Sequence, residues 1–216
     1  MLRPLFALSL CLMLLPLAGQ SDSSGYRRLQ LGVVGGQSYS EVDFTPNRDV
    51  HTRPGRTFGV ALRYFDKQLV GFQAELAYED AGWLEDLDGG GEYERRTDYA
   101  ELQILTQFSF GCGFFQPLLQ AGPFVSVPLG ETIVLPPEYD PEDYPDNAYY
   151  EVELDKRVNY GLRAGLGFNL EFGPVTLQAE GRYLQGFSNL IRPGTRNIST
   201  SIRRAFGAHL GVFYAL

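Results

Sequence analysis

Apolar residues recur at every second position along several stretches of this chain, and this alternation constrains the fold more than any other feature of the sequence. From Tyr160 to Phe172 every even-numbered residue is apolar or aromatic, while the odd positions hold glycine, arginine, asparagine or glutamate. A helix repeats every ~3.6 residues and cannot produce this pattern, whereas a strand turns successive side chains to opposite faces. The stretch therefore predicts a strand with one apolar face and one small or polar face.

The same alternation returns along the rest of the chain. Five further segments carry it clearly, at 58–64, 70–78, 100–110, 175–183 and 205–216. Two noisier segments, 27–40 and 114–129, bring the number to eight. No stretch beyond the N-terminus reaches the roughly 18 consecutive apolar residues that a membrane-spanning helix needs, so a helical membrane protein is excluded.

The connections between these segments alternate in length. Tight turns at 66–68, 111–113 and 173–174 contrast with long joins, predicted as loops, at 41–56, 79–97, 131–157 and 188–200. Short turns on one rim and long loops on the other are typical of outer-membrane barrels, whose strands need about 9–11 residues to cross the bilayer. We therefore predict an all-β fold, an eight-stranded antiparallel up-and-down transmembrane β-barrel with both termini on the periplasmic side.

A soluble barrel or sandwich is the alternative architecture. Lipocalin-like barrels also alternate, but their apolar face points inward around a ligand. Here the second face is rich in glycine, alanine and charges of both signs, which suit a narrow interior, while the leucine, phenylalanine, tyrosine and valine face suits lipid. The composition of the two faces favours the membrane barrel.

The N-terminus has the composition of an export signal. Arg3 precedes a mostly apolar run from Leu5 to Ala18, and small residues follow at Ala18 and Gly19. This order of a basic, an apolar and a small-residue region is typical of a secretory signal peptide. We predict a signal peptide at 1–20, a barrel domain at 21–216, and export to the outer membrane of a Gram-negative bacterium.

Several strand segments resemble one known family. The run 99–105, Tyr-Ala-Glu-Leu-Gln-Ile-Leu, and the run 116–124, Gln-Pro-Leu-Leu-Gln-Ala-Gly-Pro-Phe, resemble consecutive strands of PorT-like outer-membrane β-barrel proteins. Residues 160–167 and 180–183 match later strands of that family, although Gln103 stands where the family usually has proline. The resemblance implies a barrel rather than an activity. A secretion role tied to the family's namesake is not carried over, because no residue here encodes it.

Composition excludes several classes of function. The 18 Lys and Arg against 26 Asp and Glu give a formal net charge of −8, whereas a nucleic-acid binder needs a basic footprint. A four-ligand structural zinc site would need nearly all of the two cysteines and two histidines, and their spacing fits no such site. We expect no nucleic-acid partner, no cofactor, no metal site and no catalytic residues.

Charged residues on the small or polar face form the candidate site. Alternation places six of them in the lumen: Arg63, Glu75, Glu101, Arg163, Glu180 and Arg182. Buried charges must be paired, and both signs are present, so we interpret them as a structural network that fills the barrel. A binding site or a proton path is the alternative. The same alternation predicts that Leu166 faces lipid and Gly165 faces the lumen, so that Gly165→Ser costs less than Leu166→Arg provided that the lumen has room.

The predicted role is non-enzymatic: surface binding, adhesion or a structural role in the envelope. Two alternatives stay open. A lipid-modifying barrel enzyme would need a serine and an acid close to His209, the one histidine in a predicted strand. A small transport channel would need a continuous water-filled lumen. Expected partners are outer-membrane lipid, lipopolysaccharide and the barrel-assembly machinery during insertion; the sequence does not identify an extracellular or envelope protein partner.

The loop at 131–156 is the most acidic part of the chain. It holds nine acidic residues, four prolines and four tyrosines, without the ligand spacing of a calcium loop. We expect a solvated, mobile loop. Divalent-ion bridging to lipid phosphates, or a protein partner that holds the tyrosines, are the alternatives.

Overall fold

A computed structural model describes residues 28–67, 69–87, 91–110, 113–137, 139–140, 150, 152, 154, 158–195 and 197–216. The predicted signal peptide at 1–20 lies outside these residues. Among the described residues, no helix has the length and apolar character needed to cross a membrane.

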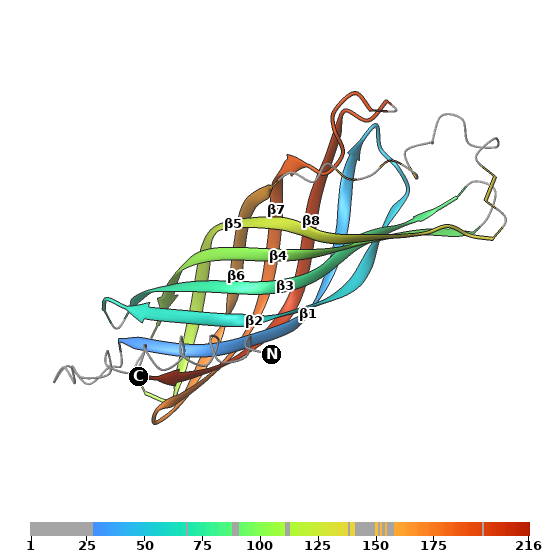
Figure 1. The fold of residues 1–216 in the computed structure, drawn as a ribbon. Coiled ribbons are helices and arrows are strands. Elements are labelled where there is room, and N and C mark those ends of the chain that lie inside the picture. The colour runs from blue at the N-terminus through green and yellow to red at the C-terminus, as the bar shows by residue number, and fades with distance from the viewer. Residues whose placement is uncertain are drawn as a thin grey trace, which may run out of the picture.

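Eight antiparallel strands form a closed barrel (Figure 1). They are β1 Leu29–Thr45, β2 Val50–Phe65, β3 Val70–Asp86, β4 Glu92–Ser109, β5 Phe115–Val134, β6 Asn159–Phe172, β7 Val175–Asn189 and β8 Thr200–Ala215. Each strand pairs with its neighbours in sequence, and β8 pairs with β1 from Gln30↔Ala215 to Thr45↔Thr200 to complete the ring. The predicted eight-stranded up-and-down barrel is confirmed.

The outer wall of the barrel carries a broad apolar band. Leu166 and Leu210 are the most exposed apolar side chains of this band, at 69% and 68%. Its members include Leu31, Val33, Val60, Leu62, Leu76, Leu102, Ile104, Leu162, Leu166, Leu177, Leu210 and Val212. A soluble protein does not expose a continuous apolar surface of this extent, whereas a lipid-facing barrel wall requires one.

Aromatic side chains border the apolar band on both sides, as interfacial girdles do in outer-membrane barrels. On one side Tyr39 stacks on Phe206 with ring centroids 5.4 Å apart. On the other, near the tight turns, Phe114 packs edge-on against Phe172 at 4.9 Å. We call the end beyond the first girdle, where the β1–β2, β3–β4, β5–β6 and β7–β8 connections lie, the loop end, and the opposite end the turn end.

The strands continue beyond the apolar band at the loop end, so the predicted loops at 41–56 and 79–97 are wrong. Those residues belong mostly to strands, and the connections shorten to 46–49 and 87–91. The alternation persists there but its polarity reverses: inward-facing residues become apolar and outward-facing residues become charged. Because the apolar residues lie on the inward face here, a search for outward apolar residues does not detect these strand ends.

The reversal is visible on β1 and β4. Within the band, the inward positions of β1 include Gln30 and Ser38, but farther along Val42 and Phe44 point inward and are buried. On β4 the inward Tyr93 is fully buried. Water replaces lipid around this part of the chain, so apolar side chains turn away from it into an interior.

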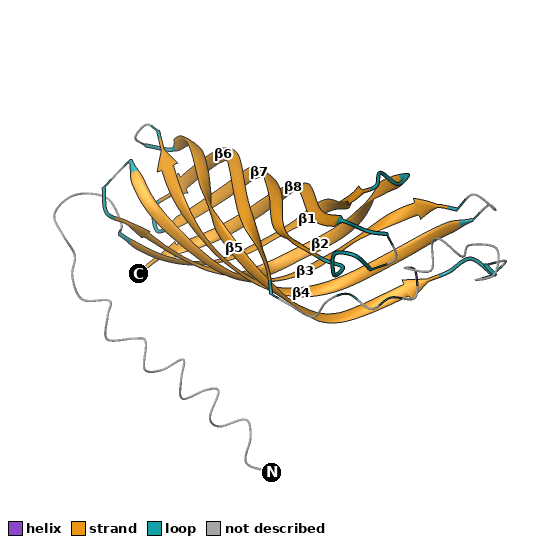
Figure 2. Cartoon of the chain, turned by 90° about the horizontal axis from the view of Figure 1, so that it is seen from above, coloured by secondary structure: helices purple, strands orange, loops and turns teal. Residues whose placement is uncertain are grey.

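The wall divides into two sheets at the loop end. Among the described residues, β1 pairs with β2 as far as Ser40↔Arg53, and β5 pairs with β6 as far as Ser126↔Asn159. Beyond these points β3, β4 and β5 continue together with the start of β2, and β8 continues with β1. Figures 1 and 2 show β3, β4 and β5 reaching outward as an arm distinct from β8 and β1.

A hydrophobic cluster, which we call the loop-end core, links the two sheets and the connections between them. Its buried members are Val42, Phe44, Trp83, Leu87, Tyr93, Tyr150, Leu154, Leu190, Ile191 and Ile198. They come from β1, β3, β4 and three of the four loop-end connections. The protein thus has a second packed interior outside its membrane band.

Candidate functional site

The lumen is filled by charged and amide side chains. All six residues predicted to face the lumen are buried there, with side chains that point inward from β2, β3, β4, β6 and β7. The structure brings them together in three layers along the barrel, and adds two charged residues that the prediction missed.

The middle layer joins opposite walls of the barrel. Arg182 on β7 donates two hydrogen bonds to the carboxylate of Glu75 on β3, at 2.6 and 2.7 Å, and a third to Glu180 at 2.6 Å. Because β7 lies four strands from β3 in either direction around the ring, this two-pronged pair crosses the lumen. Bidentate arginine–carboxylate pairs are the strongest of the side-chain ion pairs.

Glutamine amides complete the middle layer. The Nε2 groups of Gln73 and Gln103 donate to the Glu75 carboxylate, and Gln120 donates to Glu180. Each buried carboxylate therefore has both ionic and hydrogen-bonded partners. These partners offset the cost of burying charge in a lumen of low dielectric constant.

The layer nearer the loop end is a four-residue ionic network. Glu79 accepts from Arg163 at 2.8 Å and forms an ion pair with Arg203 at 2.7 Å. Glu101 lies 2.7 Å from Arg163 and 3.6 Å from Arg203. The guanidinium of Arg203 also covers the ring of Tyr99, 4.6 Å from its centroid. Two arginines from β6 and β8 thus face two glutamates from β3 and β4.

The layer near the turn end is built around Arg63. Its Nε donates to Gln73 at 2.8 Å and its Nη1 to Gln30 at 3.2 Å, while Nη2 donates to Gln178. The guanidinium lies 3.7 Å from the centroid of the buried Phe213 ring. Arg63 therefore reaches the acidic residues through glutamines, since Gln178 in turn donates to Glu180 at 3.0 Å.

Glu79 and Arg203 are the functional residues that the sequence reasoning missed. Glu79 lies one residue after the predicted strand segment 70–78, and Arg203 lies two residues before the segment 205–216. Glu79 has the same parity as Glu75, and Arg203 the same parity as His209, so extending the alternation by one or two residues would have found them. With them the three layers hold four arginines and four glutamates, which balances their formal charge.

The lumen has little room at Gly165. A Cβ atom at this position would lie 2.6 Å from Glu180 Oε2 and 3.2 Å from Cγ of Gln120. The room on which a low cost of Gly165→Ser depends is therefore absent, because Glu180, which pairs with Arg182, occupies the space. A cavity of about 10 Å³ lies beside Ser38, Glu79 and His209, and that volume admits about one water molecule.

The β5–β6 connection is fastened to the barrel by one arginine at the loop end. Arg95 on β4 is completely buried, donates to Glu131 on β5, and donates to the backbone carbonyl of Val152. Leu154 N–H donates to the same Glu131 carboxylate at 3.2 Å. The planar guanidinium can hold several acceptors at once, so Arg95 ties β4, β5 and the connection together.

Aromatic residues add a second attachment. Tyr150 donates through its hydroxyl to Glu85 at 2.8 Å, and its ring packs on Tyr93 with centroids 4.6 Å apart. Burial raises the pKa of Tyr93 above its usual range, so the Tyr93 hydroxyl stays neutral. The prediction of a solvated, mobile loop at 131–156 is therefore wrong for 131–134, which belong to β5, and for Tyr150 and Leu154, which are buried in the loop-end core.

The sequence matches a family model described as outer membrane protein beta-barrel domain over residues 18–192. The chain belongs to this family and is an outer-membrane β-barrel protein of a Gram-negative bacterium. A comparison with curated protein sequences gives no match.

Solved structures similar to this chain are also outer-membrane barrels. Neisserial surface protein A shares 11% identity, with 86% of this chain and 97% of that chain covered and a TM-score of 0.48. The N-terminal β-barrel domain of Pseudomonas aeruginosa OprF shares 10% identity, with 88% and 100% covered and a TM-score of 0.42. The attachment invasion locus protein of Yersinia pestis, in complex with the heparin analogue sucrose octasulfate, shares 14% identity, with 87% and 99% covered and a TM-score of 0.41.

Proposed function

We propose that this barrel is a non-conducting, non-enzymatic surface protein whose folded loop end binds or anchors another component outside the cell. The observation that carries the proposal is the loop-end core, which lies beyond the apolar band. Outer-membrane barrels place their longer loops outside the cell, so this packed interior forms an external platform. A barrel that served only to span the membrane would gain nothing from strands of 18 and 20 residues in β4 and β5.

The filled lumen supports this proposal over a channel. Arg182 and Glu75 connect opposite walls, and Glu79 and Glu101 hold two further arginines in the next layer. Moving an ion past these layers would require paired charges to separate inside the barrel, which is costly. A small transport channel would need a wetted path in the same place.

The surroundings of His209 support the proposal over a lipid-modifying enzyme. Among the residues that the structure describes, none forms a hydrogen bond with either ring nitrogen of His209. A nucleophile activated by histidine requires such a bond, with an acid orienting the other nitrogen. His209 instead lies inside the barrel, between Gly36 on β1 and Glu180 on β7.

The proposal includes membership of the narrower PorT-like family. It also includes contacts with outer-membrane lipid, with lipopolysaccharide and with the barrel-assembly machinery. None of these identifies what the loop end binds. Photo-crosslinkers placed on exposed residues of the loop end, such as Glu92 and Thr132, can capture a neighbour on intact cells for identification by mass spectrometry. We expect a reproducible partner or surface glycan at both positions.

A matched variant separates a specific surface from incidental contacts. Trp83→Ala removes a large side chain from the loop-end core, while the lumen layers and the apolar band stay unchanged. Crosslinks should be lost in this variant although the barrel keeps its folded electrophoretic mobility. Identical crosslinks in both proteins, or crosslinks to periplasmic components alone, would contradict the proposal.

A further inference from the structure

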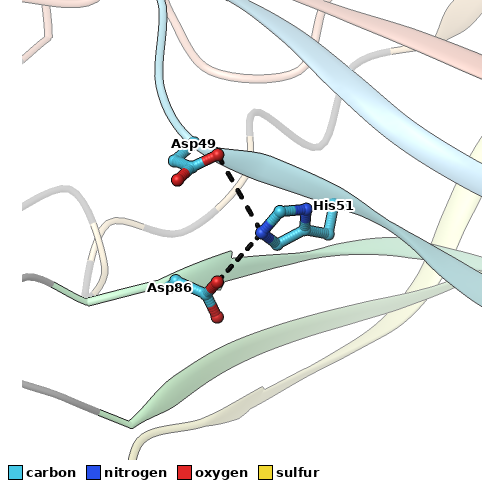
Figure 3. A group of neighbouring side chains, drawn as sticks. All are labelled: Asp49, His51 and Asp86. Carbon is cyan, nitrogen blue, oxygen red and sulfur yellow. Dashed lines mark hydrogen bonds and ion pairs between the residues drawn. The ribbon is translucent and has the colours of Figure 1, made fainter.

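Three side chains with metal-ligating atoms converge at the loop end, away from the lumen. The Nε2 atom of His51 lies 3.0 Å from Asp86 Oδ2 and 3.9 Å from Asp49 Oδ1 (Figure 3). One ligand atom from each of the three residues lies within 4.8 Å of the other two. Figure 3 shows both carboxylates directed at the same ring nitrogen.

The strand register holds His51 close to Asp86, and Asp49 joins them as the last residue of the β1–β2 connection. Val50 on β2 pairs with Glu85 on β3, and His51 pairs with Leu84. One step beyond the last pair, Asp49 falls opposite Asp86. His51 and Asp86 are therefore diagonal neighbours on the outward face of one antiparallel pair, and Asp49 approaches His51 from the connection.

The spacing of the three donors suits a small divalent ion. Zinc binds imidazole nitrogen and carboxylate oxygen at about 2.0–2.2 Å, and tetrahedral geometry then requires donors about 3.3–3.6 Å apart. The observed 3.0 and 3.9 Å lie on either side of that range. The three side chains are roughly half or more exposed, so an ion can enter. A water molecule can then occupy the fourth coordination position.

We propose that Asp49, His51 and Asp86 bind a divalent transition-metal ion, of which zinc is the best match. The imidazole distinguishes the site from a general acidic surface, because nitrogen ligands favour zinc, copper and nickel over calcium and magnesium. The ion would lie between the Nε2 atom of His51 and the two carboxylates. It would join the start of β2 to the end of β3, and so fasten the outermost part of the arm.

Zinc titration of the refolded mature barrel in detergent, with any histidine tag removed, tests the site. Isothermal calorimetry should show a zinc site that is lost in His51→Ala and weakened at least about tenfold in Asp86→Asn, as expected when a ligand is removed. Cobalt gives a second readout, since tetrahedral Co²⁺ bound through His51 should produce visible absorption bands that His51→Ala abolishes. Magnesium in excess should not displace either ion.

Asp43→Asn is the matched control, because Asp43 is another exposed carboxylate at the loop end and pairs instead with Arg204 at 2.6 Å. This variant should bind zinc as the parent protein does. The acidic residues of the β5–β6 connection also offer zinc ligands. The measured quantity is therefore the difference in the number of bound zinc ions between the parent protein and each variant. Equal zinc binding in the parent and in both His51→Ala and Asp86→Asn, or an equal loss in Asp43→Asn, would overturn the proposal.

Discussion

At the scale of single residues, the barrel depends on charges that meet across the lumen. Glu79 is the clearest example, since its two oxygens bind Arg163 and Arg203, and both arginines turn also to Glu101. A buried network in which each charge has partners contributes little net stability compared with an apolar interior. Removing one member is a different matter, because it leaves an opposite charge uncompensated.

Glu79→Gln should therefore destabilise the barrel by about 3–5 kcal/mol, the range for breaking a buried ion pair from one side. Reversible urea unfolding in lipid vesicles measures the change. Glu79→Gln combined with Arg203→Met removes one charge of each sign and should recover part of the loss. A double variant as unstable as the sum of the two single variants would argue against coupling between these residues.

Neighbouring residues on β6 test the two faces of the wall. Leu166→Arg places a charge in lipid and should cost about 2–4 kcal/mol. Gly165→Ser should cost about 1–3 kcal/mol, because the new side chain displaces the Glu180 carboxylate from Arg182. Gly130→Ser on β5 is the control, since a Cβ there meets no atom within 4 Å. If Gly165→Ser is as mild as the control in vesicle refolding, the lumen is looser than its contacts indicate.

At the scale of elements, each strand serves two environments. The lower part of β4 faces lipid through Leu102 and Ile104, whereas its upper part faces water through Glu94 and buries Tyr93. One strand can do this because alternation fixes which residues share a face but not which face is apolar. We expect the loop-end core to open locally while the membrane part stays folded, because separately packed interiors can open as separate cooperative units.

Arg95→Ala should release the β5–β6 connection, because it removes the donor shared by Glu131 and Val152. We expect trypsin to cleave after Lys156 or Arg157 at least about tenfold faster. This factor corresponds to a decrease of roughly 1.4 kcal/mol in the free energy that holds the connection on the barrel. The membrane-embedded barrel should keep its folded electrophoretic mobility. Arg204→Ala, which breaks an exposed pair on the outer wall, serves as the control. Unchanged cleavage in Arg95→Ala would show that the aromatic contacts of Tyr150 suffice alone.

At the scale of the whole molecule, the structure combines a closed membrane barrel with a second hydrophobic interior beyond it. An eight-stranded barrel is just wide enough for side chains to fill, and here arginine, glutamate and glutamine fill it in three layers. The two interiors have opposite polarity because lipid surrounds one and water surrounds the other. This arrangement suits a protein that displays a surface rather than one that conducts.

Purified protein in planar bilayers should accordingly show no stable open conductance. The layers of Arg63, Glu75–Arg182 and Glu79–Arg163 leave no room for a hydrated ion without separating buried pairs. Single-channel recording at several voltages, with a known porin as a positive control, measures this. Reproducible large conductance steps from the pure protein would contradict the packing of the lumen.

The alternation of the sequence by itself determined the number of strands, their order around the ring, and the lipid or lumen side of residues such as Leu166 and Arg163. These are local properties, because neighbours two apart on a strand share a face wherever the strand lies. Only the tertiary structure decided that Arg182 meets Glu75, that Tyr93 and Trp83 enter a common core, and that Asp86 joins His51. Partners across a lumen depend on the register of every strand between them and on closure of the ring. The loop-end core was missed for a related reason: its alternation changes phase where lipid gives way to water, and a sequence does not mark where the membrane ends.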